Sequence, residues 1–218
     1  MDWADRAEAA AARYREGEAR VGGLDDADQR QRQLTRLGNA AWAAGLCRLM
    51  AGQADESAEW LRRAAAHYRE SWPEAPPDSW GRPIGVLKSL LLAGGDAAEA
   101  ARRALDAGAA AAASPVGRYA GTLALLVLGR DAEAAALAAT LEGRGDFPRD
   151  VAAALAALAA GDGPAYRVAV ESVLRSFETR VDFLEDVAVA DTVLVLQRLA
   201  APRGLAARLS SSALLPRS

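Results

Sequence analysis

Apolar residues recur every three or four positions along most of this chain, which is the spacing of amphipathic helices. In the first stretch Trp3, Ala7, Ala10 and Tyr14 share one helical face. Turns rich in glycine, proline or aspartate separate the periodic segments. The pattern predicts helices over residues 3–20, 27–50, 53–68, 84–93, 97–112, 116–128, 132–141, 151–160, 165–177, 187–199 and 205–209. The carboxylates of Asp25-Asp26 suit the start of the second helix, and Ser114-Pro115 is an N-cap followed by a proline that opens the sixth.

The first half of the second predicted helix, Gln29–Gln33, is polar on all sides, and we expect it to project or line a surface. Arginines in this stretch could contact an acidic partner, whereas the aspartates just before them offset the charge and favour a solvated helix face. The arginines are Arg30, Arg32 and Arg36, and the aspartates are Asp25, Asp26 and Asp28.

Residues 72–83 interrupt the helical pattern with four prolines and two tryptophans. Proline prevents a continuous helix, and the tryptophans argue against a loose linker. We therefore expect an ordered crossing loop before a helix at Ile84. Trp72 and Trp80 could line a binding groove, because exposed tryptophan often anchors interfaces, or they could fill a gap in the packing.

The run Val187–Leu199 is rich in β-branched residues and by propensity alone suits a buried strand. No partner strand is evident elsewhere in the sequence, so we expect a buried terminal helix. Glu178, Asp182, Glu185 and Asp186 precede the run at helical spacing. They could coordinate a hard cation, but neighbouring arginines favour a surface charge network.

Composition supports an all-α fold, since roughly a quarter of the 218 residues are alanine, the strongest helix former. A net charge of -3 disfavours nucleic-acid and anionic-membrane partners. The single Cys47 and single His67 exclude an intrachain disulfide and the usual zinc sites. The apolar runs are shorter than a membrane span, and the first residues lack the order of a secretory signal, so we expect a cytoplasmic protein.

Turn glycines recur at Gly52, Gly95, Gly129 and Gly161, at intervals of 43, 34 and 32 residues. The positions five, nine and twelve residues after each glycine are mostly small or apolar: Ser57, Leu61, Ala64; Ala100, Ala104, Ala107; Ala134, Ala138, Leu141; Tyr166, Val170, Val173. This pattern resembles the tetratricopeptide repeat, in which small residues let two helices of a hairpin approach closely. The resemblance covers roughly residues 38–177 and is clearest in the first unit.

The tetratricopeptide resemblance implies an α-solenoid of stacked antiparallel helical hairpins. We expect a single domain over residues 1–218: N-terminal helices in 1–37, four hairpin repeats in 38–177 and capping helices in 178–218. A second resemblance concerns the C-terminal third. Its alanine-rich hairpins, the Gly161-Asp162 turn before Tyr166, and the Leu214-Leu215-Pro216 ending look like all-helical immunity proteins of bacterial polymorphic toxin systems.

Binding of a protein or peptide on a concave groove is the expected function, since stacked hairpins expose an extended inner face. We expect no catalytic site, no cofactor site and no metal site. The candidate partner-binding residues are Trp42, Trp72, Trp80, Arg82, Tyr68 and His67. Two alternatives stay open: an immunity protein that neutralises one toxin, and an all-α enzyme or small-ligand sensor. His67 is the residue on which an enzyme would depend, together with Glu178, Asp182 and Glu185.

Overall fold

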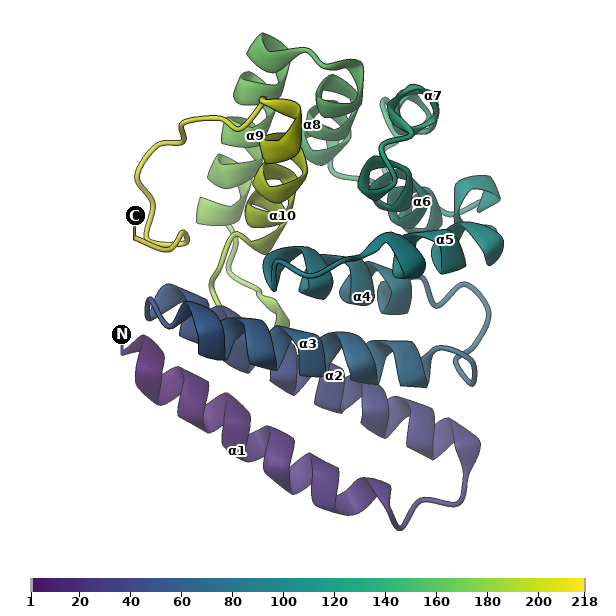
Figure 1. The fold of residues 1–218 in the computed structure, drawn as a ribbon, viewed down its shortest axis with the longest axis vertical. Helices are drawn as coiled ribbons and strands as arrows, with labels where there is room; N and C mark the ends of the chain where they lie inside the picture. Colours follow the sequence, from purple (N-terminus) through teal and green to yellow (C-terminus); the bar gives the residue numbers. More distant parts are fainter. Residues whose placement is uncertain (1, 218) are drawn as a thin grey trace. The chain divides into compact units, whose positions relative to one another are not determined.

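The computed structural model describes residues 2–217, which form helices and connecting loops without any strand (Figure 1). The helices are α1 Trp3–Val21, α2 Ala27–Met50, α3 Ala54–Ser71, α4 Gly81–Leu92, α5 Ala98–Asp106, α6 Pro115–Val127, α7 Asp131–Ala139, α8 Arg149–Ala160, α9 Gly163–Glu178 and α10 Asp191–Ala200. Short 3₁₀ turns, η1 to η3, occupy Ala109–Ala111, Leu184–Asp186 and Ala201–Arg203. The all-α prediction is confirmed.

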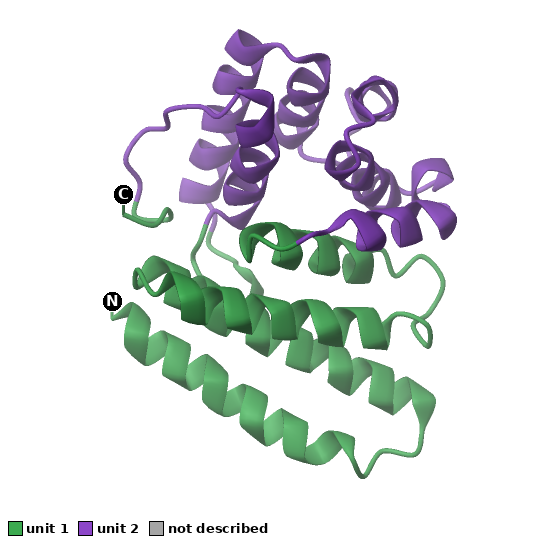
Figure 2. Cartoon of the chain, in the orientation of Figure 1, with its two compact units in different colours: residues 1–95, 181–189, 213–218 green, residues 96–180, 190–212 purple. Residues whose placement is uncertain are grey.

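Contacts divide the described residues into two compact units (Figure 2). Unit 1 contains residues 2–95, 181–189 and 213–217, and therefore helices α1 to α4 with the turn η2. Unit 2 contains residues 96–180 and 190–212, with helices α5 to α10. Within unit 1, α2 packs between α1 and α3, and α3 also packs on α4. Within unit 2, each helix from α5 to α9 packs on the next, and α10 contacts α8 and α9.

Two helix starts follow directly from local sequence. The Asp26 carboxylate accepts a hydrogen bond of 2.7 Å from the backbone N–H of Gln29 and caps α2. The Ser114 hydroxyl accepts one of 3.2 Å from the Gly117 amide, and Pro115 occupies the first position of α6. Both starts were predicted from these residue types.

Four turns share one backbone geometry. Their glycines, Gly52, Gly94, Gly129 and Gly161, have φ values of +77°, +66°, +68° and +72°. In each turn the next amide donates to the carbonyl five residues earlier: Gln53 to Arg48, Gly95 to Leu90, Arg130 to Leu125, and Asp162 to Ala157, at 2.9 to 3.0 Å. This is the pattern by which a left-handed glycine ends a helix. The predicted anchor Gly95 thus lies one residue after the true turn glycine.

The recurrent small and apolar positions are buried in three of the four sets. Those after Gly52, Gly129 and Gly161 are buried throughout, whereas in the second set Ala107 is exposed. The second set differs because α5 begins four residues after Gly94, whereas the other three helices begin two residues after their glycine. The register chosen from Gly95 is therefore wrong for this set.

Tight packing in unit 1 depends on glycines that face the side chains of α3. A Cβ built on Gly45 of α2 would lie 2.7 Å from Cγ of Leu61, and the Ser57 hydroxyl donates 2.8 Å to the Gly45 carbonyl. The Tyr68 ring lies between Gly38 of α2 and Gly85 of α4, and a Cβ on either would approach it to 2.7 Å. These glycines let the helix backbones approach closely.

Four predicted elements differ from the structure. Helix α4 begins at Gly81 and includes Pro83, because proline is tolerated in a first helical turn. Helix α5 ends at Asp106, before Gly108 with φ +89°. Residues 187–190 form no regular element, with buried Val187 and Val189, so only α10 from Asp191 onward is helical. Residues 205–209 are not helical, since the chain turns at Gly204 with φ +69°.

The polar start of α2 lines a surface through its exposed residues Gln29, Arg30 and Arg32, but two of its glutamines face inward. Gln31 is only 2% exposed, and Gln33 is also buried. The Gln33 side-chain amide donates 3.0 Å to the Gly17 carbonyl of α1, and the Gln31 side-chain oxygen accepts 2.8 Å from Arg82 of α4. Hydrogen bonds to neighbouring helices satisfy these amides, which is why polar residues are tolerated there.

Candidate functional site

A row of arginines borders two neighbouring hollows on unit 1. Arg6, Arg13 and Arg20 are seven residues apart on α1, so they lie on one face of that helix. Arg36 of α2 borders the same hollow as Arg13 and Arg20. We call these four residues the arginine row. They bring together guanidinium groups, which bind carboxylates and phosphates with a planar fork of donors.

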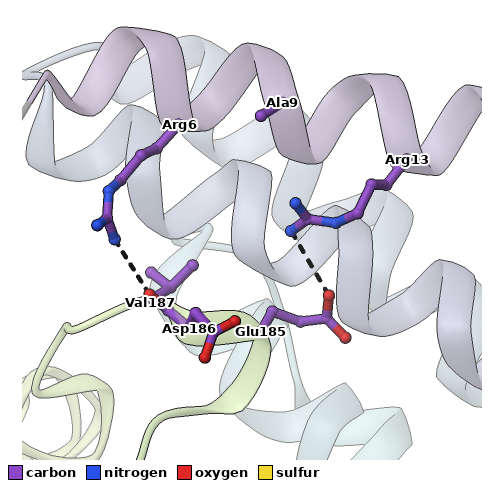
Figure 3. A pocket seen from close by; sticks show the side chains of 6 residues that line it. All are labelled: Arg6, Ala9, Arg13, Glu185, Asp186 and Val187. Carbon is purple, nitrogen blue, oxygen red and sulfur yellow. Dashed lines mark hydrogen bonds and ion pairs between the residues drawn. The ribbon is translucent and has the colours of Figure 1, made fainter.

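The first hollow, of about 370 Å³, contains an acidic turn (Figure 3). Its lining residues are Arg6, Ala9, Arg13, Glu185, Asp186 and Val187. Nη1 of Arg6 donates 3.1 Å to the backbone carbonyl of Asp186, and Nη2 of Arg13 lies 3.5 Å from the Glu185 carboxylate. Residues 182–186 of this chain, hereafter the acidic turn, therefore dock on half of the arginine row.

The backbone of the acidic turn is unusual. Glu185 and Asp186 have φ values of +55° and +58°, in the left-handed region that non-glycine residues seldom occupy. The next residue, Val187, is buried and anchors the turn within unit 1. Strained backbone of this kind persists only where surrounding contacts hold it. Here Arg6 and Arg13 contact the turn, and backbone hydrogen bonds from Asp186 to Phe183 and from Val187 to Leu184 close it.

The second hollow, of about 420 Å³, borders the other half of the arginine row. It is lined by Arg13, Glu16, Gly17, Arg20, Gln33, Arg36, Leu37, Ala40 and Glu185. Within residues 2–217, neither Arg20 nor Arg36 pairs with a carboxylate, and both are exposed. The second hollow thus offers two available guanidinium groups beside Arg13, whose side chain is 49% exposed.

The predicted partner-binding residues occupy several different places in unit 1. Trp42, Tyr68 and Trp80 are buried, and the Trp80 ring nitrogen donates 3.1 Å to the Asp78 carboxylate. Trp72 is partly exposed. Burial of three rings shows that they contribute to packing, and a role for any of the six residues in partner binding stays a prediction.

Arg82, another predicted contact, is partly buried and hydrogen bonded within unit 1. Its Nη2 donates 2.8 Å to Gln31, whose own side-chain amide donates 2.9 Å to Asp28. Burial lowers the pKa of Arg82 from its ordinary value. The guanidinium is therefore committed to joining α4 with α2.

His67 belongs to a polar cluster between α1 and α3. The Tyr14 hydroxyl lies 2.8 Å from Nε2 of His67 and donates 3.1 Å to the Glu18 carboxylate. Burial lowers the pKa of His67, and burial with the neighbouring Glu18 raises that of Tyr14 to about 12. Trp60 packs edge-on against Tyr14, with ring centres 5.2 Å apart. The cluster is uncharged at Tyr14 and His67 near neutral pH, which suits a packing role.

The other titratable candidates do not assemble into a metal site. Among residues 2–217, no group of three His, Cys, Asp or Glu side chains could hold a metal ion. Glu185 of the predicted carboxylate set pairs with Arg13 instead. Cys47 is buried, and burial raises its pKa to about 11, so its thiol stays protonated.

Across residues 2–217, no helix combines the length and apolar character needed to cross a membrane.

Unit 2 has a shallow hollow of its own between α8 and α9. Its volume is about 870 Å³, and Val168 on its border is 69% exposed. The lining is mostly small or apolar, with two charged residues from the first turn of α8: Arg149, Asp150, Ala153, Pro164, Ala165, Val168, Ala169, Ser172 and Ser176. This surface lacks the concentration of like charge found along the arginine row.

The chain matches no protein-family model, no curated protein and no solved structure. The chemistry of its own residues therefore carries the functional argument.

Sequence reasoning named Arg36 as a residue that could meet an acidic partner but missed Arg6, Arg13 and Arg20. Their spacing of seven was a usable signal, because residues two turns apart share a helix face. The docking of Glu185 was not readable from the sequence, since 172 residues separate it from Arg13.

Proposed function

We propose that this protein is a helical-repeat interaction module that binds a partner protein at the arginine row of unit 1. One observation carries the proposal: Arg20 and Arg36 are exposed and unpaired among the described residues, beside a hollow that already holds a carboxylate. Like charges gathered in this way repel one another, and a ligand of opposite charge relieves that repulsion.

Arginine suits this task for physical reasons. Its guanidinium keeps its charge at all relevant pH values and presents donors in a planar arrangement that fits carboxylates. Arginine is also enriched among the residues that contribute most to protein interfaces. An interface of this kind forms quickly and weakens with salt, because part of its attraction acts through solvent.

Tetratricopeptide-like hairpins are the finer fold that we propose for the scaffold. In support, four turns share the same glycine conformation and hydrogen-bond pattern, and three of the four sets of recurrent positions are buried. The close approach of α2 to α3 at Gly45 is of the kind that small residues allow in such repeats.

Quantitative affinity capture from the source cells tests the proposal. We expect the full chain and an Arg15→Ala control to retain the same partner, because Arg15 is an exposed arginine of α1 that borders neither hollow. The double variant Arg20→Ala/Arg36→Ala is expected to lose that partner. Equal retention by the double variant and the control would overturn the proposed site.

The same capture separates the general scaffold from the immunity alternative. A single stoichiometric partner with toxic activity would favour an immunity protein. Several weakly held partners would favour a scaffold with broader recognition. In both cases the arginine row is the surface whose substitution should release the captured protein.

A further inference from the structure

We infer that the ligand of the arginine row is an acidic peptide segment, which binds at Arg20 and Arg36 and competes with Glu185 of this chain for Arg13. The inference rests on the proposed function and adds the chemistry of the partner. It also assigns the acidic turn the role of an internal competitor.

The chain itself shows which ligand the arginine row accepts. Glu185 lies 3.5 Å from the Arg13 guanidinium, and the turn that carries it also accepts 3.1 Å from Arg6 through the Asp186 carbonyl. The acidic turn is thus a peptide segment of this chain that places the Glu185 carboxylate against Arg13. A partner segment with similar groups would find the same kind of donors two helical turns further along α1, at Arg20, and at Arg36 of α2.

The second hollow is bordered by more basic than acidic side chains, so it would attract added carboxylates. Arg13, Arg20 and Arg36 border it, against only Glu16 and Glu185. The Gln33 side chain is uncharged, and its amide donates to the Gly17 carbonyl. Among the described residues, Glu185 is the one carboxylate that pairs with the arginine row, and its side chain is 27% exposed, so an incoming carboxylate can reach Arg13 in its place.

Competition between Glu185 and the partner segment predicts opposite changes in affinity for two kinds of variant. Removal of the Glu185 charge frees Arg13 for the incoming segment, so Glu185→Gln should tighten binding. Removal of Arg20 and Arg36 should weaken it. If the arginines served only to hold the acidic turn, Glu185→Gln would have no effect on any external ligand.

The probe is a fluorescein-labelled peptide of alternating Glu and Ala residues, with a Gln-for-Glu peptide of equal length as its control. Anisotropy is measured on the full chain at about 50 mM salt, where screening is modest. We expect the Glu peptide to bind and the Gln peptide not to bind. Arg20→Gln/Arg36→Gln should weaken Kd about tenfold, and Glu185→Gln should tighten it about twofold to fivefold, the range of partly exposed ion pairs.

Arg15→Gln is the matched control, because it removes one α1 charge outside both hollows. Circular dichroism of each variant confirms that the helices remain. An unchanged or weaker affinity in Glu185→Gln would overturn the inference, as would equal weakening by Arg15→Gln. Tighter binding of a labelled single-stranded RNA than of the Glu peptide would also overturn it.

The two proposals can fail separately. If the Glu peptide does not bind while partner capture still depends on Arg20 and Arg36, the acidic-segment inference is wrong and the proposed site stands. If the peptide binds as expected but capture is indifferent to Arg20 and Arg36, the ligand chemistry stands and the proposed function is wrong.

Discussion

The Arg203 guanidinium joins the C-terminal part of unit 2 to Asp131 at the start of α7, with Nη2 2.5 Å and Nε 3.2 Å from the two carboxylate oxygens. The same side chain donates to the carbonyls of Leu126 at the end of α6 and of Leu199 in α10. It is only 15% exposed. One arginine therefore connects three helices of unit 2.

Arg203→Met should lower the free energy of unfolding by about 1.5–3 kcal/mol, the usual contribution of hydrogen bonds to a charged group with little exposure. Urea denaturation provides the measurement. Arg208→Met, at an exposed position nearby, serves as the control and should change stability little. Equal midpoints for the two variants would show that the Arg203 contacts contribute nothing net.

Gly85→Ala should destabilise unit 1 although alanine favours helix. The new Cβ would lie 2.7 Å from the Tyr68 ring, which has little room to move because α2 packs on it at Gly38 and its hydroxyl donates 2.8 Å to Asn39. We expect overpacking of about 1–3 kcal/mol to exceed the helix-propensity gain of about 1 kcal/mol.

Gly81→Ala is the matched control in the same helix, since nothing lies within 4 Å of a Cβ there. It should leave the thermal unfolding midpoint unchanged or raise it. A rise in the midpoint for Gly85→Ala as well would mean that the close packing at Tyr68 relaxes without cost.

His67 should make stability depend on pH below its ordinary pKa of 6.5. Burial lowers the folded-state pKa, so the unfolded chain binds the proton more readily. Stability from this group is therefore constant above 6.5 and decreases as pH falls from 6.5 towards the lowered value. Glu18 and Glu70 act in the opposite direction and limit the decrease.

The comparison of the protein with His67→Gln measures this contribution through urea denaturation between about pH 7.5 and 5. The protein should lose stability relative to the variant as the solution becomes more acidic, because glutamine does not titrate. Parallel stability curves would contradict the assignment.

Much of the fold was predictable because local signals and helical periodicity agree. Asp26 and Ser114 cap the helices that they were expected to cap. The predictions that were wrong share a different cause. Gln31 and Gln33 look solvated in the sequence, but their side chains bind groups on other helices. Val187 and Val189 are buried in a non-helical segment, where the Val189 amide donates 2.9 Å to the Val187 carbonyl. Tertiary contacts decided both cases, and a local pattern does not contain them.

The candidate site was predictable only in part. Arg36 was considered as a contact for an acidic partner, and the α1 arginines could have been recognised by their spacing. The partial neutralisation of the row by Glu185 was not predictable, because it depends on a left-handed turn far along the chain that returns to α1.

Photo-crosslinking in the source cells tests the central claim most directly. A photoreactive phenylalanine placed at Glu16 borders the second hollow without removing an arginine, whereas one at Arg15 borders neither hollow and one at Val168 reports on unit 2. We predict a crosslinked partner from position 16, lost when Arg20→Ala/Arg36→Ala is added. Crosslinks from position 15 or 168 with none from position 16 would contradict the account.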